Sequence, residues 1–209
     1  MSPPMHRRKT LTEYQREEIN RVVKDALKEK YTNIELVQLS IKEDAIEGIT
    51  DINCRILFGE KKMTIEGTGK GPVDALFTAF RGKFVGEYCS LQRLHFSRFA
   101  VEADIEKNLG PSKTDATVEA TLEITNECGS SFFRERANSI SVVSAKVILS
   151  AMEHFINAEK CVIMLYKNLQ YAEKKGRGDM MNIYTQQLTE IIKNVSYEKV
   201  IGRLKSESN

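Results

Sequence analysis

The sequence predicts an α+β fold of duplicated β-β-β-α units with antiparallel sheets, an N-terminal helix and a C-terminal helical hairpin. Three observations predict it. Two stretches of the chain repeat the same order of three strand-like runs and one amphipathic helix, short turns separate neighbouring strand-like runs, and residues 159–209 have helical periodicity. Short turns join antiparallel strands. Because one unit alone has a one-faced sheet and a single helix, we expect both units to share one core.

The composition is typical of a soluble folded protein. The 209 residues are 41% hydrophobic and 29% charged, which is enough for one substantial core or two small ones. The formal net charge of +2 is too small to indicate a nucleic-acid partner. We therefore expect no nucleic acid among the partners.

Cysteine spacing and the N-terminal sequence bear on the compartment. The cysteines show no Cys-x-x-Cys spacing, which indicates neither a metal site nor a disulfide framework and fits a reduced, cytoplasmic protein. The N-terminus has no apolar signal segment, and no run approaches membrane-spanning length, so we expect neither secretion nor membrane insertion. The cysteines are Cys54, Cys89, Cys128 and Cys161.

Residues 1–31 are expected to form a basic tail and an N-terminal helix. Thr10-Leu11-Thr12-Glu13 has the pattern of a capping box, with Thr10 as the N-cap and Glu13 reaching back to it. The helix is expected to continue to about Lys30, because apolar residues recur at helical spacing. These are Ile19, Val22, Val23, Ala26 and Leu27.

Residues 32–158 are expected to form a domain of two repeats, the first at about 34–88. Its second strand-like run alternates apolar and polar residues, with Ile52, Cys54, Ile56 and Phe58 on one face, which indicates a strand with one buried side. Its helix carries an apolar stripe at i, i+3, i+4 spacing. The expected elements are strands at 34–41, 51–58 and 62–66 and a helix from Pro72 to about Tyr88.

The second repeat is expected at about 92–157. Its middle strand alternates in the same way, and Asn138 or Ser139 is expected to cap its helix. The interval 103–114 has no clear pattern and is expected to be a loop. The expected elements are strands at 94–101, 117–124 and 131–134 and a helix at 139–157 with Ile140, Val143, Val147, Ala151 and Phe155 on one face.

Residues 159–209 are expected to form C-terminal helices. The first helix either continues from the helix of the second repeat or begins anew. The segment 175–178 is expected to end it, and Asp179 is expected to cap the last helix. This hairpin carries more apolar surface than a free appendage would tolerate. It therefore packs either on its own domain or at an interface with a second copy or a partner.

The segment from Gly67 to Pro72 is the place where the sequence suggests a ligand site. A glycine-rich turn lets the backbone approach a partner closely, and Pro72 suits the first helical position. Free amides and the positive end of the helix dipole favour a carboxylate or phosphate. The spacing matches neither a P-loop nor a dinucleotide fingerprint. The alternative is a tight strand-to-helix connection without a ligand.

The segment Gly69-Lys70-Gly71-Pro72-Val73-Asp74-Ala75-Leu76 resembles the Gly-x-Gly-Pro-Val-Asp-Ala signature of a known family, the C-terminal allosteric domain of α-isopropylmalate and citramalate synthases. Two weaker similarities follow in the expected order. Thr114-Asp115-Ala116 resembles the family's Gly-x-Asp-Ala segment, and residues 143–151 resemble its Ala-Ser-x-x-Ala-Tyr-Leu-x-Ala-Leu helix. The similarity covers roughly residues 34–157, and the family domain is itself built from two β-β-β-α units.

The resemblance implies a function. In those synthases the domain binds leucine or isoleucine near a dimer interface and inhibits a separate catalytic barrel. This chain is too short for such a barrel, which takes roughly 200 residues or more. The resemblance therefore implies a freestanding homodimeric regulatory module that senses a branched-chain amino acid and acts on a separate isopropylmalate- or citramalate-type synthase. The alternative is a ligand-free dimerisation scaffold that recruits a partner through its terminal helices.

The implied site combines polar groups with an apolar slot. Helix-start amides around Gly71, Val73 and Asp74 are expected to bind the carboxylate, and either the Asp74 side chain or backbone carbonyls are expected to bind the ammonium. The alternative for Asp74 is a first-turn carboxylate favoured by the helix dipole. The sequence departs from the family at Ser139, where an acidic residue is usual, and at Thr114, where glycine is usual. The candidate ligand-binding residues are Gly69, Gly71, Pro72, Val73, Asp74, Leu76, Phe96, Asp115, Ala116, Val143 and Ser144.

Catalysis is not expected. No nucleophile-base pair, metal cluster or convergent carboxylate pair occurs at a known spacing. The three histidines, His6, His95 and His154, stand alone in the sequence and are expected at the surface or at an edge. We therefore expect no enzyme activity, no cofactor and no metal.

Overall fold

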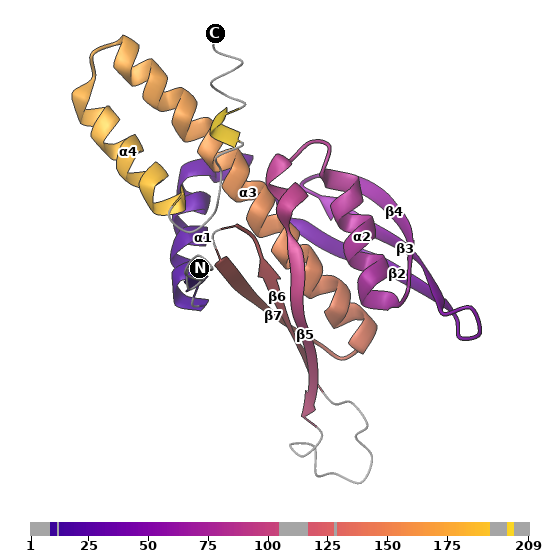
Figure 1. Cartoon of the computed structure of the whole chain (residues 1–209). Coiled ribbons are helices and arrows are strands. Elements are labelled where there is room, and N and C mark those ends of the chain that lie inside the picture. The colour runs from indigo at the N-terminus through magenta and orange to yellow at the C-terminus, as the bar shows by residue number, and fades with distance from the viewer. Residues whose placement is uncertain (1–8, 12, 105–116, 128, 193–199, 203–209) are drawn as a thin grey trace, which may run out of the picture.

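The computed structural model describes residues 9–11, 13–104, 117–127, 129–192 and 200–202. The expected loop at 103–114 falls largely outside these residues, as do Asp115, Ala116 and Cys128. The predicted α+β fold of duplicated β-β-β-α units is confirmed (Figure 1). The first unit comprises β2 (Ile34–Asp44), β3 (Ile49–Phe58), β4 (Lys61–Gly69) and α2 (Pro72–Phe84), and the second comprises β5 (His95–Asp104), β6 (Thr117–Thr125), β7 (Gly129–Ala137) and α3 (Ile140–Lys174).

The two sheets are antiparallel within each unit, as the short turns predict. The first sheet has the order β2-β3-β4, and the second has the order β1-β7-β6-β5, in which β1 (Lys9–Leu11) adds a parallel edge strand. The predicted alternation is confirmed in both middle strands. The buried residues on the predicted faces of β3 and β6 are Ile52, Cys54, Ile56, Val118, Ala120, Leu122 and Ile124, whereas Phe58, at the end of β3, is only half-buried.

The helices pack on the apolar faces of the sheets and on each other. Helix α2 packs against β3 and β4, whereas α3 packs against β6 and β7 and also reaches β2 and α2 (Figure 1). The two units therefore share one core, with α3 in contact with both sheets. The predicted inward position of Ile140 is wrong, because this first residue of α3 precedes the packed turns and is 60% exposed.

The N-terminal segment differs from the predicted capping box. Thr10 lies in β1 opposite Ser130, and α1 (Glu13–Leu27) begins three residues after Thr10, followed by the 3-10 helix η1 (Lys28–Lys30). Thr10 is therefore not the N-cap, because pairing with β7 takes its backbone into a sheet. The predicted apolar face of α1 is confirmed at Ile19, Val23 and Leu27, which are buried.

The C-terminal part of the chain is one long helix and a shorter one. The expected helix at 139–157 continues without interruption as α3 for 35 residues, and α4 (Gly178–Ile192) folds back against it. Asp179 lies inside the first turn of α4, 3.7 Å from Arg177, and is not the cap. Leu188, Ile191 and Val200 are buried, so the hairpin packs on its own domain.

The length of α3 corrects the expectation that no run approaches membrane-spanning length. By length and composition α3 is the one helix of the described residues that qualifies as a candidate membrane span. However, 67% of its most apolar window is buried inside the protein. A buried core helix passes the same test, and the contacts of α3 with both sheets explain its apolar character.

Polar side chains near the middle of α3 hold the chain segments that lead into each unit. The Asn157 side chain is hydrogen-bonded to both the N–H and the C=O of Thr32, each at 2.8 Å. The carboxylate of Glu159 accepts the N–H groups of Cys89 and Ser90 at 3.1 and 2.8 Å. These contacts fix the entry to β2 and the 3-10 helix η2 (Cys89–Arg93), which leads into β5, on the same helix.

His154 corrects another expectation. It is 3% exposed and lies on α3 between α1 and β7, where its Nδ1 is 2.7 Å from Asn20 Oδ1 and its ring contacts Phe133 and Phe155. Nε2 is buried without a hydrogen-bond partner in the described structure. Burial, with the positive charge of Arg16 second, lowers the pKa of His154 to about 3. This residue is therefore a neutral core histidine.

Candidate functional site

The connection between β4 and α2 is shorter than the sequence suggested. Strand β4 extends through Gly69, so Gly67 and Gly69 are strand residues paired with β3, and only Lys70 and Gly71 link the strand to the helix. The expected glycine-rich turn is thus a two-residue connection. Pro72 is the first residue of α2, as predicted.

Two of the three glycines are explained by close packing of α2 on β4. A Cβ at Gly67 would lie 2.5 Å from the Cβ of Ala79, and a Cβ at Gly69 would lie 2.5 Å from the backbone nitrogen of Ala75. No side chain fits at either position unless the helix moves away. Gly71 differs, because a Cβ there would have no neighbour within 4 Å. Only Gly71 has open space beside it.

The side chain of Asp74, in the first turn of α2, contacts the connection between β4 and α2. Its Oδ2 accepts a hydrogen bond from the backbone N–H of Lys70 at 3.0 Å. The carboxylate is exposed and lies in the first turn of α2, where a negative charge is favoured by the helix dipole. Asp74 therefore shapes the turn, and its second oxygen accepts no hydrogen bond within the described residues.

The start of α2 presents backbone amides that no side chain caps. Gly71 is the N-cap and offers no side-chain acceptor, although its carbonyl accepts the N–H of Ala75 at 2.9 Å. Across the described parts of the chain, the N–H groups of Val73 and Asp74 have no side-chain acceptor. An anionic group placed beside Gly71 would meet these amides and the positive end of the helix dipole.

The start of α3, which corresponds in the second unit to the start of α2, is capped by a side chain of the chain itself. Ser139, one of the two residues expected to cap α3, is its N-cap, and its Oγ accepts the N–H of Val142 at 3.5 Å. The hydroxyl of Ser144 donates to the carbonyl of Ile140 at 2.7 Å. The two helix starts therefore differ, since the first offers free amides and the second satisfies one of its own.

The apolar candidates fall into two groups. Leu76 and Val143 are fully buried in the core, whereas Val73 and Phe96 are half-buried. Phe96 of β5 packs edge to face on Phe77 of α2, with ring centroids 4.3 Å apart. The structure thus brings the second unit's Phe96 against α2, and Val143 and Ser144 lie on the helix that packs beside α2. Asp115 and Ala116 lie outside the described residues.

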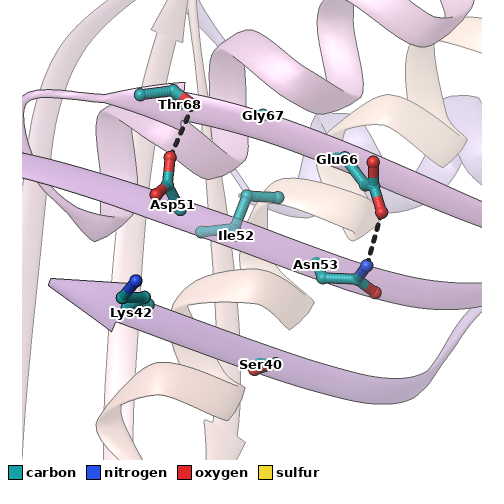
Figure 2. A pocket seen from close by; sticks show the side chains of 8 residues that line it. All are labelled: Ser40, Lys42, Asp51, Ile52, Asn53, Glu66, Gly67 and Thr68. Atoms are coloured by element: carbon teal, nitrogen blue, oxygen red, sulfur yellow. Dashed lines mark hydrogen bonds between the residues drawn. The ribbon is translucent and has the colours of Figure 1, made fainter.

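A shallow cavity that sequence reasoning missed lies on the solvent face of the β2-β3-β4 sheet. Its volume is about 330 Å³, and Figure 2 looks onto this face, with the helices behind the sheet. The strict alternation of β3 was the available signal, because it places a polar face opposite the buried one. The lining residues are Ser40, Lys42, Asp51, Ile52, Asn53, Glu66, Gly67 and Thr68.

The cavity contains two hydrogen-bonded side-chain pairs. Thr68 Oγ1 donates to Asp51 Oδ1 at 2.7 Å, and Asn53 Nδ2 donates to Glu66 Oε1 at 2.6 Å (Figure 2). Lys42 lies opposite Asp51 in the register of β2 and β3. Within the described part of the chain, no group of three or more His, Cys, Asp or Glu side chains is arranged to hold a metal ion.

Fold and site together define a duplicated α+β module with an uncapped helix start on one unit. A comparison with protein-family models matches residues 13–156 to the LeuA allosteric (dimerisation) domain. The chain belongs to this family, the regulatory domain of isopropylmalate and citramalate synthase type. Such a domain is regulatory and non-catalytic, which supports a regulatory and homodimerising role in a synthase context. No curated protein matches the chain.

Proposed function

We propose that this protein senses a branched-chain amino acid, leucine or isoleucine, at the start of α2 and regulates a separate synthase. The observation that supports the proposal most is the uncapped helix start at Gly71 within a chain of the LeuA allosteric family. The amides of Val73 and Asp74 would bind the carboxylate of the amino acid. The half-buried Val73 and Phe96 would contact its side chain.

The asymmetry of the two helix starts favours one ligand per chain. Ser139 already occupies the position that a carboxylate would take at α3, while nothing from the described residues occupies it at α2. Asp74 has one carboxylate oxygen engaged by Lys70 and one left for the ammonium. We also propose a cytoplasmic location, which agrees with the free thiols of Cys54 and Cys161.

The substitution Gly71→Asp tests the site directly. The new carboxylate would cap α2 and occupy the place of the ligand's carboxylate, while the extended backbone at Gly71, with φ of 176°, accommodates any residue. We expect stability to change by about 0.5 kcal/mol or less, and leucine binding to be lost. Calorimetry with leucine, isoleucine and leucinamide, which lacks the carboxylate, measures this.

Gly86→Asp is the matched control, because a Cβ at Gly86 also has no neighbour within 4 Å and lies away from the start of α2. Unchanged leucine affinity in Gly71→Asp would refute the assigned site. Absence of any calorimetric or thermal response of the unmodified protein to branched-chain amino acids would refute the sensing function itself.

The second candidate function is a ligand-free dimerisation scaffold that recruits a partner through its terminal helices. The packing role of Gly67 and Gly69 favours it, because the fold needs these glycines whether or not a ligand binds. Co-purification with an isopropylmalate-type synthase would fit both functions. An association that does not change when leucine or isoleucine is added would favour the scaffold.

A further inference from the structure

The cavity on the solvent face of the β2-β3-β4 sheet is built from two rungs of side chains across the strands. One rung runs from Lys42 through Asp51 to Thr68, and the next runs through Ser40, Asn53 and Glu66. Side chains opposite each other on neighbouring strands lie roughly 5 Å apart at Cβ, and rungs two residues apart are separated by roughly 7 Å. Acidic groups therefore stand on both rungs, and a cation stands on the first.

The two carboxylates are held in place and retain binding capacity. Thr68 orients Asp51 through one oxygen, and Asn53 orients Glu66 through one oxygen, so each carboxylate keeps a second oxygen for a ligand (Figure 2). Lys42 is exposed and forms no ion pair within the described residues. The first rung thus pairs a positive with a negative group, and the second rung ends in a negative group.

We propose that this cavity binds a basic α-amino acid, with its α-carboxylate at Lys42, its α-ammonium at Asp51 and its distal ammonium at Glu66. The charges of such a ligand are the opposite of those lining the cavity. The separation of the rungs suits a side chain of lysine or ornithine length. This site is independent of the proposed leucine site, because it uses the opposite face of the sheet from α2.

The surroundings of the cavity limit what binds. Arg55 lies two residues further along β3, and its guanidinium donates to the side-chain oxygen of Gln38. A positive group therefore lies beyond Glu66, on the side away from Asp51. The hydroxyl of Ser40 and the amide of Asn53 offer further polar partners beside the ligand's stem. The side chains of both rungs are exposed, and exposed ion pairs are individually weak. We therefore expect millimolar affinity that weakens as the salt concentration rises.

Titration of the isotope-labelled protein with lysine, ornithine and norleucine, followed by NMR, tests the proposal. Norleucine has the length of lysine without the distal ammonium. We expect saturable shifts on β2, β3 and β4 with lysine and ornithine, and binding by norleucine weaker by roughly two- to fivefold. Glu66→Gln should reduce lysine affinity to the level of norleucine and leave norleucine affinity unchanged. Asp51→Asn and Lys42→Met should weaken both ligands.

Glu102→Gln, an exposed carboxylate on β5 in the other sheet, is the matched control and should change nothing. Equal affinity for lysine and norleucine in the unmodified protein would overturn the proposal. So would lysine-induced shifts that persist in the Asp51→Asn and Glu66→Gln double variant. A double variant that changes only the oligomeric state, measured by sedimentation, would instead assign this face to contact between two copies and overturn it as well.

Discussion

At the scale of single residues, the glycines of the β4-α2 segment have different tasks. Gly67 and Gly69 allow the helix to approach the strand, whereas Gly71 leaves the helix start open. The sequence shows three glycines at regular spacing and does not distinguish these tasks, because the distinction depends on which atoms lie opposite each Cα. The signature that suggested a ligand site is thus partly a packing motif.

The packing role gives a prediction for Gly67→Ala. The added methyl would stand 2.5 Å from the Cβ of Ala79, so α2 must shift or the strand must bend. We expect the free energy of unfolding to fall by about 1–3 kcal/mol, measured by urea denaturation. Gly71→Ala, with open space at its Cβ, should stay close to the unmodified protein. Equal stability of both variants would contradict the packing role.

A second prediction at this scale concerns pH and His154. Burial holds the folded-state pKa of His154 at about 3, below its ordinary value of 6.5. A depressed histidine pKa means that the unfolded chain binds the proton first, so stability is fully present above pH 6.5 and falls as the pH drops toward 3. The slope for this one group approaches about 1.4 kcal/mol per pH unit.

His154→Gln removes the titrating group while keeping a polar side chain beside Asn20. We expect its unfolding free energy to depend less on pH than that of the unmodified protein between about pH 6 and pH 4. His95→Gln, at an exposed position on β5, is the control and should retain the full slope. Parallel pH profiles for His154→Gln and the unmodified protein would show that His154 does not titrate on unfolding in this range.

At the scale of elements, the sequence predicted what depends on local periodicity. Alternation on β3 and β6 identified both buried faces, and the cap at Ser139 was readable from its position before an apolar run. The continuity of α3 was not settled by the sequence, because Asn157 and Glu159 interrupt the apolar pattern. The structure gives the reason, since these polar residues are buried against the backbone that leads into each unit.

Other parts of the fold depend on contacts that no local pattern records. The pairing of β1 with β7 determines where α1 begins, and it joins segments more than 100 residues apart. The cavity on the first sheet arises in the same way. Its charged residues come from β2, β3 and β4, and only the register of the strands places Lys42 beside Asp51.

The polar contacts of α3 give a prediction at the element scale. Asn157→Ala would leave the buried N–H and C=O of Thr32 without their partners. We expect a loss of about 2–4 kcal/mol in unfolding free energy, with increased hydrogen exchange at the start of β2. Asn182→Ala, at an exposed position on α4, should change stability by less than about 0.5 kcal/mol. Similar values for the two variants would contradict a structural role for Asn157.

At the scale of the whole molecule, the family match and the helical hairpin occupy different parts of the chain. The match to the dimerisation domain ends at residue 156, within α3, and the second half of α3 continues into the hairpin with α4. One continuous helix therefore runs from the region matched to the regulatory domain into the hairpin, which lies beyond that region. If the scaffold function holds, self-association and partner recruitment would therefore belong to separate regions of the chain.

This separation gives a prediction for the self-association of a double variant, Tyr171→Ser with Ile183→Ser. The two native side chains are apolar, lie on the hairpin and are 65% and 49% exposed. Because neither lies in the region matched to the dimerisation domain, the dimer dissociation constant should change by about twofold or less, measured by sedimentation equilibrium. Binding to a synthase should weaken if the hairpin recruits it. If the double variant is instead a monomer, the prediction is wrong. The substituted surface of α3 and α4 would then be the surface through which two copies of the chain contact each other.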